Sequence, residues 1–403
     1  MNAWKPLRHA DFALLWWASL ISNTGGWMHD MAAGWYMTTL APTPAMVALV
    51  QAATTLPVFL LALPAGAIAD NMDKRRLLMG VQVAMLLLAA TLGLLVWLDS
   101  VGAATLLWFT FALGVCTAIA SPTWQSIIPR LVSREDLQQA IAVHAAGMNI
   151  ARAIGPTIAG AIIVMAGIAW PFLLNSLSFI AVIAALWHWR AVPEKPRDKP
   201  REGFVTSVRT GIKHAAQNRT LKNTLWRSVL FFLFGSCYWA LLPLIAHTQL
   251  NGGARLFGVL VGCIGLGAVL GAMLLPRARA LLGLDRVVTL GTIGTALALC
   301  GFAPLRVPVL GMLAALLAGA SWIAALSSLN VAAQLAVPDW VRARGMALYT
   351  STFYGCLTLG SVFWGQVGAR LGLTATLLLA ASGAIVALAG AALLPLQPRP
   401  AAA

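Results

Sequence analysis

The chain has 403 residues, of which 60% are hydrophobic and 10% charged, and its mean hydropathy is +0.83. These values exclude a soluble globular protein, and the length accommodates about twelve membrane spans of ~20 residues. The formal net charge is +15, but its uneven distribution argues against nucleic-acid binding. Only four of the 27 Lys and Arg residues fall outside segments predicted on the cytoplasmic side: Arg152, Arg255, Arg306 and Arg370.

Twelve apolar stretches are long enough to cross a bilayer. The first six are predicted at 12–39, 44–69, 76–98, 103–128, 137–167 and 169–190. The second six are predicted at 221–248, 255–276, 283–303, 307–336, 341–369 and 372–395. Because the basic residues gather on one side, we expect both termini in the cytoplasm. The first apolar run is too long for a cleavable signal peptide, so we expect none.

A polar segment divides the chain into two predicted six-helix bundles, residues 1–190 and 221–403. The segment, residues 191–220, is basic and contains three prolines, which interrupt regular structure. Three of its apolar residues recur at helical spacing: Phe204, Val208 and Ile212. We therefore expect a short amphipathic helix there, either on the cytoplasmic membrane surface or in solution.

The two sets of spans carry matching glycines. A shift of 205 residues places Gly66 on Gly271, Gly114 on Gly319, Gly155 on Gly360 and Gly160 on Gly365. Matches in four different spans under one offset indicate an internal repeat. The predicted fold is therefore an all-α membrane protein with twelve transmembrane helices in two pseudo-repeated six-helix halves. A substrate site is expected between the halves, near the midplane.

The connection between the second and third spans, residues 66–76, is a candidate gate. It reads G-A-I-A-D-N-M-D-K-R-R. Gly66 permits close approach of another helix, and the Asp70 carboxylate can face the positive N-terminus of the eleventh span. Arg75 belongs to the basic cluster that follows. An ordinary positive-inside loop would explain the basic residues, but not the spacing of Gly66 and Asp70.

The fifth span contains a second candidate gating element. Gly155, Pro156 and Gly160 lie within residues 152–160, where proline kinks the helix and glycine permits close contact. The eighth span carries five glycines between positions 258 and 271. If the two spans are neighbours, small residues on both would permit a close contact along which they could slide, unless the glycines serve only tight packing.

Asp30 and Arg152 are the formally charged residues predicted well inside the apolar slab. Placing a charged side chain in the apolar part of the membrane costs free energy, so such residues usually form ion pairs or face an aqueous cavity. Three arrangements stay open: a substrate-bridged pair, a structural salt bridge, or Asp30 at the outer edge of a long first span. We predict that Asp30 takes up and releases a coupling proton and that Arg152 sets its proton affinity. His29 and His144 are competing titratable groups.

Polar and aromatic residues in several spans are candidates for a substrate cavity. Aromatic walls with scattered hydrogen-bonding groups suit amphipathic or aromatic small molecules. The candidate substrate-binding residues are Asn23, Trp27, Gln51, Trp124, Gln125, Asn149, Tyr238, Trp239, Trp322, Asn330, Tyr349 and Tyr354. The sequence lacks a Walker-type loop, a metal-ligand cluster and a nucleophile constellation, so we predict neither an enzyme nor a metal site.

Two of these stretches resemble signatures of the major facilitator superfamily. Residues 66–76 resemble its loop between spans two and three, and residues 152–160 resemble the fifth-span signature of its drug–proton antiporters. The latter departs from the pattern by having Ala151 and Ala159 where glycines are usual. The chain is similar to the enterobactin-exporter-like, or transmembrane secretion effector, branch. Further matching residues are Leu7 to Phe12, Leu14 to Trp16, Trp27, and Gly211 to Leu221.

The resemblance implies alternating-access export of drug- or siderophore-like molecules, driven by the proton gradient and without a cofactor. It also implies a bacterial cytoplasmic (inner) membrane location, and we expect a monomer. A lipid or lysolipid flippase is one alternative. A membrane receptor or scaffold that transports nothing is another.

Overall fold

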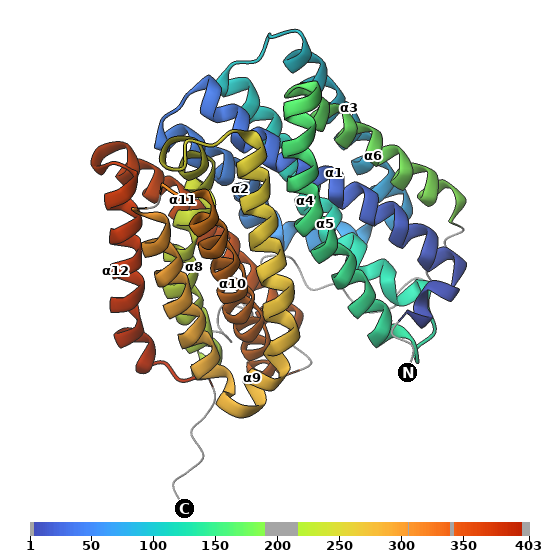
Figure 1. The fold of residues 1–403 in the computed structure, drawn as a ribbon. Coiled ribbons are helices and arrows are strands. Elements are labelled where there is room, and N and C mark those ends of the chain that lie inside the picture. The colour runs from blue at the N-terminus through green and yellow to red at the C-terminus, as the bar shows by residue number, and fades with distance from the viewer. Residues whose placement is uncertain (1–3, 190–216, 305, 339–341, 397–403) are drawn as a thin grey trace, which may run out of the picture.

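In the computed structural model, the described residues are 4–189, 217–304, 306–338 and 342–396 (Figure 1). The side chains of residues 63, 67, 69–71 and 343 are outside this description, as is most of the segment 191–220. The amphipathic helix and the domain boundaries expected there therefore stay predictions.

A short 3₁₀ helix, η1 (Lys5–Arg8), precedes six long helices in the first half of the chain. They are α1 (Ala10–Leu40), α2 (Pro44–Asn71), α3 (Lys74–Trp97), α4 (Ala103–Leu131), α5 (Leu137–Ala166) and α6 (Ala169–His188). Their starts follow local capping chemistry: the Thr43 side chain accepts the Met46 N–H at 3.3 Å, and Asp73 accepts the Arg76 N–H at 2.7 Å. Pro44 also occupies the first turn of α2, where its missing N–H costs nothing.

The second half contains α8 (Arg219–Leu244), α9 (Ala254–Phe302), α10 (Pro308–Ala336), α11 (Arg342–Leu371) and α12 (Leu373–Ala392). A π-helical turn, η2 (Ile245–Gln249), extends α8. Helix α9 is two spans joined at Gly283, whose φ of 79° lies in the region that favours glycine. The Asn218 side chain caps α8 by accepting the Leu221 N–H at 3.0 Å.

Nine helices in the described part of the chain are long and apolar enough to cross a membrane. Because α9 holds two spans, these nine supply ten crossings. Helices α1 and α11, of 31 and 30 residues, bring the number to twelve. These two helices are not among the nine apolar ones because their sequences are more polar. In α1, for example, the five residues from Ser22 to Gly26 are polar or glycine. The predicted twelve-helix fold is confirmed.

Helices α1–α6 form one bundle and α8–α12 a second, placed side by side (Figure 1). Glycines matched by the 205-residue shift occupy equivalent contacts in the two bundles. Gly155 of α5 packs against Thr24 and Trp27 of α1, and Gly360 of α11 packs against Leu233 and Ser236 of α8. Gly160 meets Ala254 across the two halves, and Gly365 likewise meets Pro44 and Ala48. These equivalent contacts support the internal repeat.

Candidate functional site

The two halves touch at mid-depth and on one side of the slab. On α1, Gly34 and Trp35 contact Phe257 of α9, with the Trp35 and Phe257 ring centroids 6.2 Å apart. Thr55 of α2 and Thr358 of α11 share a buried hydrogen bond of 2.8 Å. We call this side the opposite side, because α1 begins and α12 ends on the other, predicted cytoplasmic, side.

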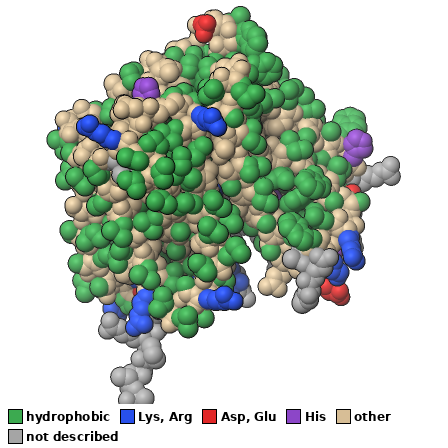
Figure 2. All heavy atoms as spheres, in the orientation of Figure 1, with side chains coloured by type: hydrophobic (Ala, Val, Ile, Leu, Met, Phe, Trp, Pro, Cys, Tyr) green, Lys and Arg blue, Asp and Glu red, His purple; other side chains and the backbone are tan. Residues whose placement is uncertain are grey.

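On the predicted cytoplasmic side the halves separate. Figure 2 shows a notch between the two bundles at the lower edge, and hydrophobic side chains over the middle of the face. Gly66, near the end of α2, has no described residue of another element within 4 Å of where a side chain would begin. The two halves therefore leave a notch between them on the side where α1 begins, and we call the space between the halves above this notch the central cavity.

One face of α1 is directed at this cavity. Asn23, Trp27, Asp30 and Gly34 recur at helical spacing, and Gly34 contacts the other half through Pro243 and Phe257. Asp30 is exposed, and no hydrogen bond or ion pair to it exists among the described residues. An exposed carboxylate on this face of α1, with no ion-pair partner among the described residues, can exchange a proton.

Arg152 approaches the same region from the middle of α5. Its guanidinium carbon lies 5.2 Å from the centroid of the Trp27 ring, a cation–π arrangement. Its Nε is buried and has no hydrogen-bond partner in the described structure. No ion pair joins Asp30 to Arg152, so the structural salt bridge considered from the sequence is not formed here.

The other half supplies an aromatic wall built around Trp322 of α10. Five rings from α8 and α11 lie with their centroids 5.4–6.2 Å from it: Phe231, Phe232, Tyr238, Trp239 and Phe353. Tyr354 stacks edge-on against Phe353 at 4.8 Å. Tyr238 and Trp322 are buried, whereas Trp239 and Tyr354 are half-buried. The structure thus brings together four of the predicted substrate residues.

Other predicted substrate residues have structural roles in this conformation. The buried Tyr349 hydroxyl donates to the Leu326 carbonyl at 3.1 Å. The Asn330 amide oxygen accepts from Gln334 at 2.6 Å, and the Asn149 amide donates to the Ala145 carbonyl of its own helix at 2.9 Å. Trp124 packs on the apolar core of the first half.

The remaining substrate candidates and the two histidines differ in burial. Asn23 and Gln51 are half-buried and Gln125 is exposed. His29 is buried inside the first half, with its ring centroid 4.8 Å from that of Phe172. His144 is half-buried on α5.

Of the two charged gating candidates in residues 66–76, the structure describes the side chain of Arg75 but not that of Asp70. Arg75 donates from Nε and Nη2 to the Leu186 and Trp187 carbonyls, at 2.7 and 2.6 Å, and so ties α3 to the end of α6. The Asp70 side chain is outside the described residues, and its gating role stays a prediction.

The small-residue seam between α5 and α9 exists but differs from the expectation. A Cβ on Gly160 would lie 2.8 Å from the Ala254 carbonyl oxygen, so Gly160 does face α9. The expectation that Gly155 also faces α9 is wrong, because it packs on Thr24 and Trp27 of α1. The Pro156 carbonyl meets Gly258, and Ala153 meets Gly265.

Two ionic clusters outside the cavity were missed from the sequence. In the first, Asp136 at the start of α5 accepts from Lys5 Nζ at 2.8 Å and contacts His9 Nε2 at 3.0 Å. Hydrogen bonds from His9, and then from Lys5, hold the pKa of Asp136 at about 2. This side chain therefore anchors η1 instead of capping α5. The sequence did contain a signal for this cluster. A basic segment that includes Lys5 and His9 precedes the first span, and the acidic Asp136 stands at the start of the fifth span, on the same predicted side of the membrane.

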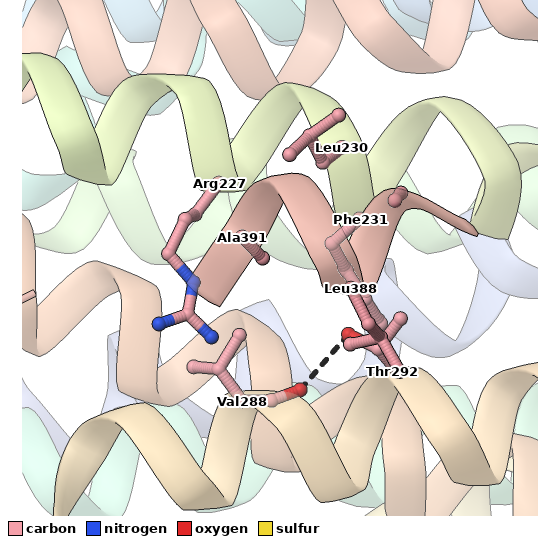
Figure 3. Close-up of a pocket in the computed structure, with 8 residues that line it drawn as sticks. Arg227, Leu230, Phe231, Val288, Thr292, Leu388 and Ala391 are labelled. Carbon is pink, nitrogen blue, oxygen red and sulfur yellow. Dashed lines mark hydrogen bonds between the residues drawn. The ribbon is translucent and has the colours of Figure 1, made fainter. Parts of the chain in front are cut away.

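The second cluster surrounds a small pocket between α8, α9 and α12 (Figure 3). Arg227, buried at its edge, forms an ion pair with Asp285 and donates to Thr289 Oγ1 at 3.3 Å. Asp285 also accepts the Leu396 N–H at 3.1 Å. The pocket lies within the second half, away from the central cavity, and its polar groups hold the chain after α12 in place.

The sequence profile of the family described as transmembrane secretion effector, within the major facilitator superfamily, matches residues 1–402. The chain belongs to this family. Its members are membrane transporters and not enzymes, and transporters of this superfamily generally need no cofactor. A small-molecule substrate and a multi-pass membrane location follow from this membership.

Two bacterial relatives are similar to this chain over most of its length. It is 27% identical to the staphyloferrin A transporter of Staphylococcus aureus, over 70% of this chain and 71% of that protein. It is also 27% identical to the enterobactin exporter EntS of Escherichia coli O1:K1, over 65% of this chain. The second match spans 61% of EntS, which is less than two-thirds of that protein.

Solved structures of transporters share the fold of this chain at low sequence identity. A mutant of the nucleoside transporter NupG superposes with a TM-score of 0.77 at 13% identity, covering 96% of this chain and 99% of that one. A bacterial homologue of the human lysosomal transporter Spinster, in an inward-facing occupied conformation, gives 0.73 at 13% identity with 96% and 97% coverage. These likenesses establish the fold alone.

Proposed function

We propose that this protein exports small amphipathic or aromatic molecules, drug- or siderophore-like, by proton antiport with alternating access. The observation that carries the proposal is the central cavity, which sets Asp30, Trp27 and Arg152 of one half against the rings of Trp239 and Tyr354 in the other. Sites of this kind, at the interface between repeats, suit substrates that must be reached from either side in turn.

Asp30 is the proposed proton-coupling residue. It is exposed on the cavity-facing side of α1 and has no ion-pair partner among the described residues. Its hydration changes when the halves rock, because Gly34, one turn further along, packs against the second half. A change in hydration alters the relative free energies of the charged and neutral carboxyl, which is the requirement for coupling.

The proposed direction of transport follows from the distribution of Lys and Arg residues between the two sides of the membrane. Arg75, Arg130, Arg134 and Arg277 lie on the side where α1 begins, and an excess of Lys and Arg favours the cytoplasmic side. The open cavity would then face the cytoplasm of a bacterial inner membrane, with both termini on that side. We also propose that the protein works as a monomer, since each chain supplies both walls of the cavity.

Transport in proteoliposomes tests this function. A pH gradient should drive accumulation of a fluorescent amphipathic dye such as Hoechst 33342 by the wild type. Asp30→Asn should abolish gradient-driven accumulation but retain gradient-free exchange, because the binding walls are intact and only the proton site is lost. Asp11→Asn, which removes an exposed carboxylate at the start of α1, is the matched control.

Wild-type accumulation by Asp30→Asn would show that Asp30 is not the coupling residue. His29 and His144 would then be examined in the same assay. Gradient-independent movement of a fluorescent lysolipid, with no dye accumulation, would instead favour the flippase.

A further inference from the structure

Three buried hydrogen-bond donors next to the central cavity have no acceptor among the described residues. Arg152 Nε, the Tyr238 hydroxyl and Trp239 Nε1 are each buried without a partner in the described structure. Buried polar groups are nearly always paired, so each unpaired one requires an explanation. Three in one place point to a common missing partner.

These donors come from both halves of the protein. Tyr238 and Trp239 are neighbours on α8, with ring centroids 5.6 Å apart. Tyr238 and Tyr354 lie close enough to the Arg152 guanidinium of α5 to interact with it electrostatically. The donors therefore converge across the interface between the halves, at the level of the aromatic wall.

The unpaired charge of Arg152 indicates what kind of ligand would bind these donors. Arg152 carries a positive charge in the middle of a membrane-spanning helix, and no carboxylate pairs with it among the described residues. Trp27 covers the guanidinium face at 5.2 Å, which leaves its N–H edge for an acceptor. An uncompensated buried cation is costly, so its natural partner is an anion with oxygen acceptors.

We propose that Arg152, Tyr238, Trp239 and Tyr354 form an oxyanion-binding subsite for a carboxylate or similar group on an aromatic substrate. This deepens the proposed function, on which it rests, by naming a substrate class. The guanidinium and the hydroxyls bind the oxyanion, and the rings of Trp27, Trp239 and Tyr354 stack on the apolar part of the molecule. Because the donors belong to different halves, the bound anion bridges them.

Binding of matched probes to the purified full-length protein tests the subsite. Naphthalene-2-carboxylate presents an oxyanion on an aromatic body, and naphthalene-2-carboxamide is its neutral counterpart. The carboxylate should bind at least about tenfold more tightly, because hydrogen bonds to a charged group are worth more than neutral ones. Arg152→Gln should remove this preference, and Arg152→Lys should restore part of it.

Two tyrosine variants separate binding from folding. Tyr238→Phe removes an unpaired hydroxyl, so it should weaken carboxylate binding several-fold without lowering the melting temperature. Tyr349→Phe removes a hydroxyl that donates to the Leu326 carbonyl, so it should lower the melting temperature and leave binding unchanged. Equal effects of the two variants on binding would overturn the proposal.

The oxyanion could belong to a soluble substrate or to a lipid headgroup. Measurements in nanodiscs of anionic phosphatidylglycerol and of zwitterionic phosphatidylcholine distinguish these two sources. Arg152-dependent stabilisation by phosphatidylglycerol, with loss of naphthalenecarboxylate binding, would assign the oxyanion to a lipid headgroup. Equal affinity for carboxylate and carboxamide in wild type would overturn the subsite while gradient-driven dye transport persisted. Loss of that transport with the carboxylate preference intact would instead count against the transport function.

Discussion

At the residue scale, Asp136 shows how a charged side chain stabilises this protein outside the membrane. Asp136 is 5% exposed and joins η1 and the start of α1 to α5 through Lys5 and His9. Because its folded pKa, about 2, lies below its ordinary value of 3.8, it contributes stability above about pH 4. That contribution is lost as the pH falls through 4 toward 2.

Asp136→Asn should therefore lower the melting temperature of the detergent-solubilised protein near neutral pH, and the deficit should shrink as the pH falls below 4. The deficit arises because the neutral amide holds Lys5 and His9 less strongly than the carboxylate does. Differential scanning fluorimetry across the pH range measures it. Glu135→Gln, at the exposed neighbouring position, is the control and should show a small deficit at every pH. An Asp136→Asn deficit that does not change with pH would mean that packing, not charge, is responsible.

At the element scale, the sequence predicted the positions of the helices best, because the thickness of the bilayer sets the length of each spanning helix. The predicted spans 44–69, 103–128 and 307–336 correspond to α2, α4 and α10 with matching or nearly matching starts. A bilayer demands about 20 apolar residues per crossing, and this requirement is visible in composition. The direction in which each side chain points is not visible there.

Gly155 and Tyr349 illustrate what the sequence could not provide. Five residues separate Gly155 from Gly160, which rotates their directions by about 140° around α5, so one faces α1 and the other α9. Tyr349 was predicted at the cavity, but its hydroxyl bonds to a carbonyl of the adjacent α10. Trp322, by contrast, lies at the middle of its span and at the centre of the aromatic wall, and its predicted contact with substrate stays a prediction.

Gly160→Leu tests the seam between α5 and α9. The new side chain would meet the Ala254 carbonyl oxygen and Arg255 Cα, at 2.8 and 3.2 Å from its Cβ, and overpacking of this kind costs about 1–3 kcal/mol. Because the seam closes the opposite side, the variant should favour opening there. A cysteine at position 254, in a cysteine-depleted background, should then react faster with maleimide.

Gly155→Leu is the matched variant for this experiment. It obstructs α1 within a single half, so it should lower stability and yield without selectively exposing position 254. If both variants changed labelling alike, the seam would have no special part in closure.

At the scale of the whole molecule, alternating access requires the open side to close. No described residue crowds Gly66 here, so Gly66→Leu should leave the melting temperature unchanged. It should nevertheless reduce transport several-fold, because α2 must approach α11 when the cavity closes. Asp70→Asn should act similarly, by removing the charge that would face the start of α11. Dye transport in proteoliposomes measures both.

Gly80→Leu provides the control for the size of the new side chain. Gly80 lies on α3, is exposed, and also has open space around it. Its substitution should affect neither stability nor transport. Wild-type transport by Gly66→Leu would contradict a closing movement at the end of α2.

Pulsed electron paramagnetic resonance across both ends of the molecule tests alternating access most directly. Spin labels at the exposed positions of Arg134 and Arg277 report the predicted cytoplasmic side, and labels at Ser100 and Arg306 report the opposite side. On a shift from neutral to acidic pH in nanodiscs, the 134–277 distance should shorten while the 100–306 distance lengthens. Asp30→Asn should remove the response. Distances that stay fixed, or that change together in the same direction, would contradict transport by rocking of the two halves.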